Sequence, residues 1–500
     1  MSLAAILTRG HQGLQAPLVT VEVHICNGLP QFSLVGLPEA AVRESRDRVR
    51  SALLHAGFEF PAQRITVNLA PAELPKHGGG LDLPIALGIL IASGQISGQL
   101  LAGVECMGEL SLGGAICAVS GLLPMVMAAV RDDHAVIVPG ANLDEAAMVP
   151  GARIISATHL LEVTAHLARK SLLSTHSVSL GMRAVIPAGL PDFQDVHGHY
   201  QIKRALEIAA AGQHNVLMEG PPGTGKSMLA RRIQSILPPL DEAEALEVAA
   251  IASLAGQLPC ADVWRRPPFR APHHTASMGA VVGGGHPVVP GEISLAHGGV
   301  LFLDELPEFG RTVLESLREP LETGSISLAR VSSKIEFPAR FQLIAAMNPC
   351  PCGYAGEGDQ CRCTILQIQR YRGRLSGPLL DRFDMFIHVS RQSDPLALEV
   401  EPSSDTSVDI AGRVDAARAL ALKRSGCPNA WMTMKDMRTC CILDSSARGL
   451  LEQAAHVWSL SHRACHRLLR LARTIADLAA SETVMQNHIA EAMIYRKPLL

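Results

Sequence analysis

The first third of the chain alternates short runs of β-forming residues with runs of helical periodicity. Residues 18–25, 64–69 and 135–139 are β-branched or apolar runs bounded by turn residues, and we expect each to form a strand. Residues 39–56 have the pattern of a charged amphipathic helix, and residues 83–92 that of an apolar helix. The pattern predicts an α/β domain.

Two changes of pattern divide the rest of the chain. Residues 169–191 are rich in Ser, Gly and Pro and show little periodicity, which predicts a linker after an N-terminal domain at residues 1–168. Residues 192–395 alternate strands and helices, as a parallel sheet requires. Residues 396–500 carry only helical patterns, so we expect a helical C-terminal domain. A length of 500 residues agrees with several separate cores.

Composition narrows the class of protein. A net charge of −3 argues against a basic protein that coats duplex DNA, so any nucleic-acid contact has to come from local basic elements. The N-terminus lacks the pattern of a signal peptide. The most apolar stretch, residues 81–96, is interrupted by Asp82, Pro84 and Gln95, and is too short to span a bilayer. We therefore expect a cytoplasmic protein without membrane contact.

A glycine-rich segment follows a predicted strand at residues 215–219 and precedes a predicted helix at residues 227–236. It fits the phosphate-binding pattern G-x-x-x-x-G-K-[ST] at every fixed position. Its residues are Gly220, Pro221, Pro222, Gly223, Thr224, Gly225, Lys226 and Ser227. Backbone N–H groups of such a loop and the helix N-terminus attract phosphate. We predict ATP binding, with Lys226 on the β- and γ-phosphates and Ser227 on Mg²⁺.

Two carboxylates follow the next buried strand. Residues 300–303 are apolar, and Asp304 and Glu305 stand directly after them. Ligands bind at this end of an open α/β sheet. We expect Asp304 to hold Mg²⁺, directly or through water, and Glu305 to polarise the attacking water as general base. A helix-capping pair is the alternative.

Two further residues complete the predicted catalytic set. Asn348 follows an apolar strand at residues 341–347, where its amide can orient water; a plain turn residue is equally compatible. Arg382 can reach the nucleotide of a neighbouring subunit as an arginine finger. Its alternative is a surface ion pair with Asp381 or Asp384, which would contribute little stability.

Four cysteines are clustered after Asn348. They are Cys350, Cys352, Cys361 and Cys363. Two close thiolate pairs are typical of a tetrahedral zinc site, so we expect a structural Zn²⁺ knuckle at residues 350–363. Four free thiols in a surface loop are the alternative, although such a cluster would be prone to oxidation.

Residues 325–331 and 335–341 alternate like the two strands of a hairpin, with Arg330 and Lys334 near its tip. Such a tip can grip DNA phosphates, and residues 370–374 form a second basic patch with an aromatic residue. Solvated charged turns explain both equally well. The adjacent His273 and His274 resemble a metal-binding pair, but adjacent histidines rarely face one ion, and we interpret them as polar residues of an insert.

Several long strings resemble the magnesium-chelatase-like family of AAA+ ATPases, and in particular its bacterial competence proteins. The strings lie at residues 35–38, 41–50, 67–72, 79–84, 269–275, 291–300, 382–384 and 470–477. They cover essentially the whole chain. The resemblance implies an α/β AAA+ core with a helical lid, and an N-terminal domain with the ribosomal-protein-S5-domain-2-like fold shared with Lon protease. Residues 76–80 hold glycine where a Lon-type site needs serine, which argues against proteolysis.

The resemblance also implies an insert near residues 271–296, a hexameric ring, and kinship with the replicative MCM helicases. The implied activity is ATP-dependent DNA translocation, with branch migration that integrates single-stranded DNA during natural transformation. Recombination proteins are further candidate partners. Arg463 falls where the family places its second sensor arginine, and Arg467 and Arg470 share its helix face.

Three functions fit these features. The first is a DNA-dependent ATPase and helicase, the second a chelatase-type motor that remodels a protein partner, and the third an ATP-binding scaffold. The set Lys226, Asp304, Glu305 and Arg382 argues against the scaffold. The ATP site is the same in the first two, so stimulation by single-stranded DNA separates them.

Overall fold

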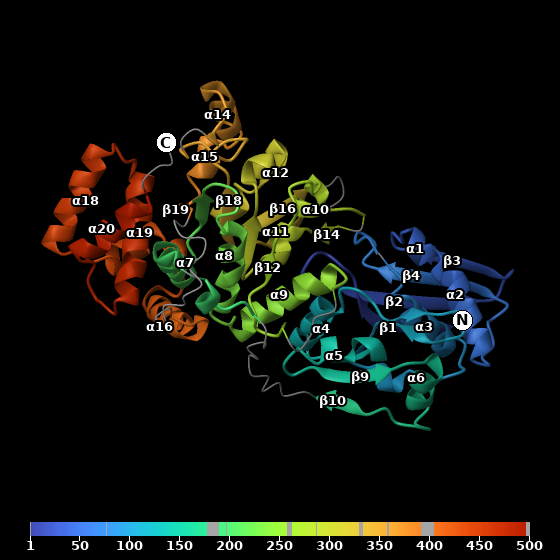
Figure 1. Cartoon of the computed structure of the whole chain (residues 1–500). Coiled ribbons are helices and arrows are strands. Elements are labelled where there is room, and N and C mark those ends of the chain that lie inside the picture. Colours follow the sequence, from blue (N-terminus) through green and yellow to red (C-terminus); the bar gives the residue numbers. More distant parts are fainter. Residues whose placement is uncertain are drawn as a thin grey trace.

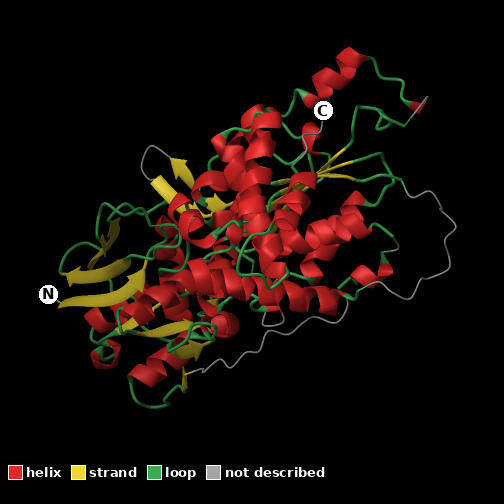
Figure 2. Ribbon diagram, turned by 90° about the vertical axis from the view of Figure 1, so that its left-hand side faces the viewer, coloured by secondary structure: helices red, strands yellow, loops and turns green. Residues whose placement is uncertain are grey.

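The computed structural model has an N-terminal domain at one end, an α/β core in the middle and a helical lid at the other end (Figure 1). Seen from the side, the N-terminus lies at the outer edge of the N-terminal domain (Figure 2). The structure describes residues 2–76, 78–177, 190–196, 198–257, 263–286, 288–329, 334–357, 360–391 and 405–496.

The N-terminal domain contains an eight-stranded mixed sheet in the order β10-β9-β8-β5-β1-β2-β4-β3. Its strands are β1 (Ser2–Arg9), β2 (Leu18–Cys26), β3 (Gln31–Val35), β4 (Arg64–Ala70), β5 (Val104–Cys106), β8 (Ala135–Pro139), β9 (Arg153–Ala157) and β10 (Thr175–Ser177). A small pair, β6 (Glu109–Leu110) and β7 (Ile116–Cys117), lies outside this sheet. The strands predicted at residues 18–25, 64–69 and 135–139 are confirmed.

Six helices accompany this sheet. They are α1 (Ala40–Arg43), α2 (Ser45–His55), α3 (Asp82–Ala92), α4 (Leu122–Arg131), α5 (Leu143–Ala146) and α6 (Leu160–Leu167). The predicted helix at residues 39–56 is divided into α1 and α2 at Glu44, although the backbone of Glu44 remains helical. The apolar helix predicted at residues 83–92 is α3, which is buried over nearly its whole length.

Part of the expected linker belongs to the N-terminal sheet. The strand β10 pairs antiparallel with β9, from Thr175 opposite Ile155 to Ser177 opposite Arg153. An edge strand is held by backbone hydrogen bonds along one side, so its polar Thr-His-Ser sequence gives no apolar signal. Residues 178–189 of the expected linker, and residues 392–404 around the second expected boundary, lie outside the described residues.

The core sheet is parallel, with the order β12-β15-β18-β11-β19. Its strands are β11 (Val216–Glu219), β12 (Phe269–Arg270), β15 (Val300–Leu303), β18 (Gln342–Met347) and β19 (Met385–His388). Alternate residues enter different cores: Val216 and Met218 pack on one face, and Leu217 on the other. Because both faces are covered, β15 is wholly apolar and β11 and β18 are mainly apolar, which is why these three strands were predictable.

Short helices surround this sheet. They are α7 (Tyr200–Gly212), α8 (Lys226–Arg232), α9 (Glu242–Leu254), α12 (Arg311–Ser316), α13 (Pro320–Thr323), α14 (Ile365–Arg372) and α15 (Gly377–Leu380). The expected insert contains α10 (Met278–Val282), β13 (Gly283–Gly284), β14 (Val289–Pro290) and α11 (Glu292–Leu295). The expected hairpin is confirmed as β16 (Ser325–Ala329) paired antiparallel with β17 (Lys334–Pro338).

Within residues 405–496, the lid consists of helices and their connecting loops, as its pattern predicted, with one isolated bridge between Leu443 and Val484. Its helices are α16 (Ser407–Ser425), α17 (Met434–Cys440), α18 (Ser445–Val457), α19 (His462–Leu478) and α20 (Gln486–Ile494). The helices α16 and α19 pack against α7, and their apolar residues share one cluster with the core sheet. The lid is therefore docked on the core. Across the part of the chain that the structure describes, no helix is both long and apolar enough to cross a membrane.

The N-terminal domain is docked on the core through α4 and α9. Leu123 and Val126 of α4 share an apolar cluster with Ala249 of α9 and with Trp264. At the same contact, the Ser253 hydroxyl donates to Glu145, and the Gly121 N–H donates to the Ser253 carbonyl over 3.0 Å. The sequence pattern did not predict this contact, because α9 is apolar on more than one side.

Candidate active site

The glycine-rich loop lies at the carboxyl end of β11, between the ends of β18 and β19. The Gly220 N–H donates to the Met347 carbonyl over 3.2 Å. A Cβ atom on Gly220 would lie 2.2 Å from the Val389 carbonyl oxygen, so close packing of β19 requires glycine here. Gly225 has φ of +80° and leads into α8. The predicted strand, loop and helix are therefore all present.

Lys226 is folded back against this loop. Its Nζ donates to the carbonyl oxygens of Gly220 and Pro221, over 2.7 and 2.8 Å, and to Asn348 Oδ1 over 3.2 Å. The residue is 8% exposed, and burial lowers the pKa of its ammonium. The structure thus brings the loop lysine to Asn348, two residues that the sequence connected only through their positions after strands.

Ser227 and Asp304 meet beside this lysine. The Ser227 hydroxyl donates to Asp304 Oδ2 over 2.5 Å, and the Glu305 N–H donates to Asp304 Oδ1 over 3.0 Å. A hydroxyl and a carboxylate are the hard oxygen ligands that suit Mg²⁺. The residues present therefore fit the metal ion predicted from the sequence.

Glu305 has a left-handed backbone, with φ of 53°. This conformation is uncommon outside glycine and costs about 1–3 kcal/mol, a strain typical of functional sites. Its Oε2 lies 3.3 Å from His274 Nδ1. The His274 ring is flanked by His273, with centroids 4.1 Å apart, and by the edge of Phe309.

The contact between His274 and Glu305 was not predicted from the sequence, which indicated only a polar residue of the insert. The strand β12 pairs in parallel with β15, so the residues that follow both strands emerge at the same edge of the sheet. Correct placement of the short strand β12 would have given this contact. Two residues are too few for a strand signal.

Arg382 lies at the amino ends of the parallel strands, whereas the loop lies at their carboxyl ends. We call these two sides of the sheet the amino edge and the carboxyl edge. Its carbonyl accepts from Asn215 Nδ2 over 2.9 Å, and Asn215 precedes β11 whereas Gly220 follows it. A strand of this length separates the two edges by about 13 Å. The ion-pair partner of Arg382 is Glu322, and not Asp381 or Asp384 as the surface-pair alternative supposed.

Three arginines of α19 face this edge, and they differ in their partners. Arg467 donates to the Phe383 carbonyl, and Arg470 to the carbonyls of Ala430 and Met432. Burial lowers the pKa of both guanidinium groups. Arg463 is the exposed member, with 66% of its side chain accessible, and it donates to Glu322 Oε1 over 2.7 Å. The geometry therefore favours Arg463 over its two neighbours as a residue that can receive a ligand.

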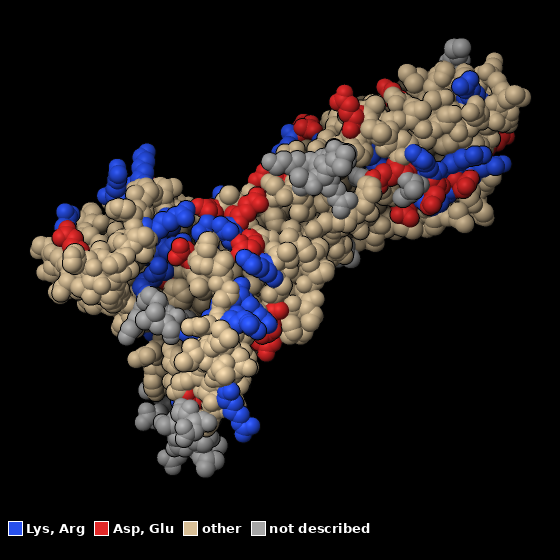
Figure 3. Space-filling model, turned by 90° about the horizontal axis from the view of Figure 1, so that it is seen from above, with Lys and Arg blue, Asp and Glu red and all other residues tan. Residues whose placement is uncertain are grey.

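These arginines line a cavity of about 380 Å³ between the core and the lid. Lys and Arg side chains gather between lid and core on the face seen in Figure 3. The charged residues of the lining are Glu322, Arg382, Arg463, Arg467 and Arg470. The cavity is thus an anion-attracting site made of core and lid residues together.

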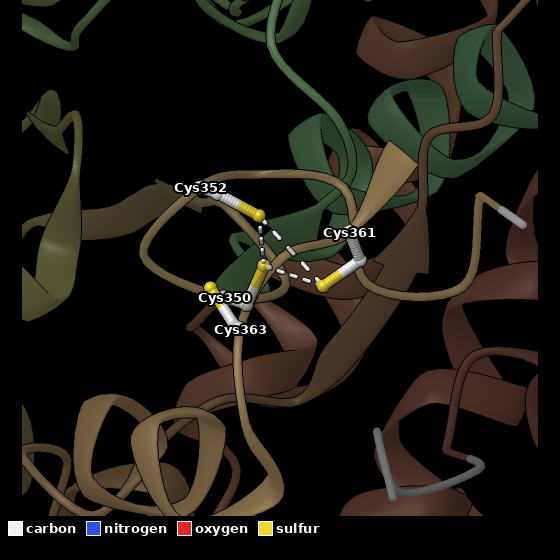
Figure 4. A group of neighbouring side chains, drawn as sticks. All are labelled: Cys350, Cys352, Cys361 and Cys363. Atoms are coloured by element: carbon white, nitrogen blue, oxygen red, sulfur yellow. Dashed lines mark hydrogen bonds between the residues drawn. The ribbon is translucent and has the colours of Figure 1, made fainter. Parts of the chain in front are cut away.

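The four clustered cysteines converge on one point (Figure 4). Three sulfur pairs are 3.3, 3.7 and 3.8 Å apart, and all four ligand atoms lie within 4.8 Å of one another. A tetrahedral site with the usual zinc–sulfur bond length has sulfur atoms about 3.8 Å apart. Backbone N–H groups of Tyr354 and Arg362 lower the pKa of Cys352 to about 6, which favours a thiolate. The residues fit Zn²⁺.

This cysteine knuckle stands directly on the phosphate-binding loop. Cys350 follows Asn348 by two residues and is fully buried. Gly353 has φ of +87°, and a Cβ atom on it would lie 2.6 Å from Pro222 Cδ. The knuckle therefore contacts both the residue after β18 and the loop after β11.

The DNA-contacting residues predicted from the sequence have mixed outcomes. Arg330 lies outside the described residues, and Lys334 begins β17. The second basic patch stays a prediction, with fewer available groups than the sequence indicated: Tyr371 is buried, Arg372 and Arg374 pair with acids of the core over 2.7 and 2.8 Å, and Arg370 is exposed. The sequence shows the three arginines together, but not that Arg372 and Arg374 have acidic partners.

Three family models match the chain. They are magnesium chelatase, subunit ChlI, at residues 192–396; subunit ChlI of Mg-chelatase at residues 21–142; and the C-terminal part of that subunit at residues 404–496. The matches cover the core, most of the N-terminal sheet and the lid.

Curated relatives match over nearly the full length. The competence protein ComM of Haemophilus influenzae is 47% identical over 498 residues, covering 99% of this chain and 98% of that protein. The uncharacterized protein YifB of Escherichia coli is 48% identical over 496 residues, covering 99% and 97%. The DNA replication licensing factor Mcm6 of Drosophila melanogaster is 22% identical over 327 residues, covering 60% of this chain and 36% of that protein. The chain belongs to the magnesium-chelatase-like AAA+ family that includes ComM and YifB.

Proposed function

We propose that the chain hydrolyses ATP with the residues at the carboxyl edge of its core sheet. The observation that carries this proposal is the contiguous polar set formed by Lys226 with Asn348, and by Ser227 with Asp304 and Glu305. Each member comes from the end of a different parallel strand or from the helix that follows one.

Each residue has a role in this proposal. The Lys226 ammonium leaves the loop carbonyls and binds the β- and γ-phosphates. Ser227 and Asp304 hold the metal ion. When bound, the ion held by Ser227 and Asp304 would neutralise negative charge on the phosphates. Glu305 accepts a proton from the attacking water, and the Asn348 amide orients that water. The distances from Lys226 to Asn348 and from Ser227 to Asp304 support this arrangement.

We further propose that the active form is a ring, in line with the hexamer that the family resemblance implies. Arg382 sits about 13 Å, one strand length, from the loop of its own chain, so its guanidinium is suited to the nucleotide of a neighbour. Arg463 shares its cavity and its carboxylate partner, and we assign it to the same neighbouring phosphate.

The proposed substrate of the motor is DNA, single-stranded or branched, and the proposed process is branch migration during recombination in competent cells. The names of two relatives support DNA: a competence protein at 47% identity and a replication licensing factor at 22% identity. The hairpin β16–β17 is the element proposed to contact DNA, with Lys334 at the start of its second strand. The alternative is a motor that remodels a protein, as the chelatase family models suggest.

The test is ATP hydrolysis by the purified chain with and without single-stranded or forked DNA, beside Lys226→Ala. Stimulation of at least about tenfold that is lost in the variant supports the DNA motor. Hydrolysis that ignores DNA contradicts it and supports a protein-remodelling ATPase. No hydrolysis above the level of the Lys226→Ala chain contradicts the enzyme.

We also propose that the cysteine knuckle holds one structural Zn²⁺. Four sulfur atoms at near-tetrahedral separations support it, as does the burial of Cys350. The ion would fix the knuckle against Pro222 and thereby shape the phosphate-binding loop. Its proposed role is structural and not chemical.

A further inference from the structure

Glu322 is the one acid among the described residues that line the arginine cavity. Both of its carboxylate oxygens are used: Oε2 accepts from Arg382 and Oε1 from Arg463. These are the two residues that the proposed function assigns to the phosphate of a neighbouring subunit. A carboxylate and a terminal phosphate present similar pairs of oxygen atoms to a guanidinium fork. Glu322 therefore occupies the position of an incoming anion.

Arg382 has a hydrogen-bond donor that Glu322 does not satisfy. Only 10% of its side chain is exposed, and its Nε has no hydrogen-bond partner in the described structure. Buried charged donors are normally satisfied, because an unpaired donor costs free energy. Arg382 thus retains an unused donor for an anion with more oxygen atoms than a carboxylate.

Glu322 is also attached to the hairpin. It lies in α13, and two residues, Thr323 and Gly324, separate it from the start of β16. The Thr323 hydroxyl donates to the Ser325 carbonyl over 3.0 Å, and the Ala339 N–H donates to the Gly324 carbonyl over 2.8 Å. These bonds close the base of the hairpin. Glu322 is therefore joined to the base of the hairpin by two residues, and a displacement of the hairpin would move it.

We propose that Glu322 is a built-in competitor of the neighbouring subunit's phosphate, and that the hairpin β16–β17 withdraws it when DNA binds. This inference rests on the proposed function, because it needs Arg382 to act across the subunit boundary. It adds the device that makes turnover depend on DNA. Without DNA, Arg382 and Arg463 remain on Glu322; with DNA, they are released to the phosphate.

The exchange is physically reasonable because the contact between Glu322 and Arg463 is weak. The Glu322 side chain is 51% exposed and that of Arg463 is 66% exposed, so water and salt screen the pair. A triphosphate brings more charge and more acceptors, and charge-assisted bonds to it are stronger. A small movement of Glu322 is then enough to decide which anion the two arginines hold.

The experiment compares Glu322→Gln with the wild-type chain in ATP hydrolysis, with and without single-stranded DNA. The substitution keeps the size of the side chain and removes its charge. We expect the DNA-free rate to rise about three- to tenfold and the ratio of DNA-stimulated to DNA-free rate to fall toward one. DNA affinity, measured by fluorescence anisotropy, should stay within about twofold, because the hairpin itself is unchanged.

Glu319→Gln is the matched control. Glu319 is an exposed acid that immediately precedes α13, and no ion pair is found for it within the described residues. It should leave both rates unchanged. If Glu322→Gln lowers both rates equally, Glu322 only positions the arginines, and the inference is wrong. An unchanged stimulation ratio overturns it as well.

A parallel Arg382→Ala chain separates this inference from the function beneath it. If Arg382→Ala retains wild-type turnover, the proposed role of Arg382 across subunits has failed, and the inference falls with it. If Arg382→Ala loses turnover while Glu322→Gln keeps the wild-type ratio, the proposed function stands and Glu322 alone is excluded as the competitor.

Discussion

The two edges of the core sheet are built in different ways. At the carboxyl edge, Lys226, Ser227 and Asp304 all have partners within their own chain. At the amino edge, Arg382 and Arg463 share a single half-exposed acid. The first edge is a satisfied network, and the second is a group of cations with too few anions.

The difference indicates which edge works alone and which needs a partner. A satisfied network is already arranged for its ligand and requires only the exchange of weak loop contacts. The Arg382 side chain is only 10% exposed, and a nearly buried cation with an unsatisfied donor is costly unless a further anion completes its contacts. The carboxyl edge is thus a complete half of a site, and the amino edge is an incomplete half. In a ring of copies, the amino edge of one subunit would meet the carboxyl edge of the next at each subunit boundary.

The largest expected effect comes from mixing two inactive variants, which tests whether the two edges act in different subunits. Arg382→Ala should bind ATP yet lose about 10³-fold or more in turnover, the effect typical of an arginine finger. Lys226→Ala should lose ATP binding. Equimolar mixing should restore part of the hydrolysis, because Arg382 of one chain then faces an intact loop of the other. The measurement is steady-state ATP hydrolysis across mixing ratios.

Absence of any recovery, with assembly of the mixed chains verified by light scattering, would place Arg382 and Lys226 in the same functional site. The comparison of edges would then be wrong. Lys435→Ala is the control for mixing, since Lys435 is exposed on the lid. It should bind ATP and turn it over like the wild type.

The next effect concerns Glu305 within the complete edge. Glu305→Gln should bind ATP with wild-type affinity but lose about 10²–10⁴-fold in turnover, the contribution typical of a general base. Nucleotide binding by calorimetry and single-turnover hydrolysis separate the two properties. Glu308→Gln, a nearby change of an acid that pairs with Arg374, is the control. Normal turnover by Glu305→Gln would remove it from the proposed role.

Removal of zinc from the knuckle tests whether ATP binding at the carboxyl edge depends on the knuckle. We expect one zinc per chain by mass spectrometry, and none in Cys361→Ser. Because Gly353 rests on Pro222, loss of the ion should weaken ATP binding about tenfold, or ~1.4 kcal/mol. Cys117→Ser changes an exposed cysteine of the N-terminal domain and should alter neither property. Unchanged ATP affinity in a zinc-free chain would contradict the supporting role.

The complete edge was largely predictable from the sequence, and the incomplete one was not. Lys226 follows the loop after β11, and Asp304 and Asn348 directly follow β15 and β18; these strands are mainly apolar and parallel, so strand direction alone brings the three residues to one edge. Glu322 comes from a four-residue helix without periodicity, and Arg463 from the lid. Their meeting depends on how the lid docks on the core. A one-dimensional pattern does not record that docking.

Short or polar elements were missed for a related reason. The edge strand β10 and the two-residue strand β12 are held by backbone hydrogen bonds, which leave little trace in side-chain pattern. The contact of His274 with Glu305 depends on β12 and was missed with it. The packing of α9 on α4 was not predicted, because α9 packs apolar residues against two different clusters and so has no single apolar face.

The smallest effect concerns what fastens the incomplete edge to the sheet. Asp384 is buried, and its Oδ2 accepts from the Asn215 N–H over 3.1 Å and lies 3.6 Å from His214 Nδ1. Burial alone would raise the pKa of Asp384, but His214, Arg467 and the Asn215 N–H hold it below its usual range. Its ionised form therefore stabilises the fold.

Asp384→Asn should lower the free energy of unfolding near pH 7 by about 1–3 kcal/mol, because a buried charge-assisted network loses its anion. A depressed pKa in the folded chain means that this contribution is complete above the unfolded value, about 3.9, and is lost as pH falls through the lower folded value. Urea unfolding between pH 7 and pH 4 should therefore show a steady gap between variant and wild type that narrows only at the acid end. Asp381→Asn, on the exposed neighbour, should show no gap. A gap that instead widened toward acid would mean that Asp384 is protonated in the folded chain, and that the arginines of this edge are held by something other than its charge.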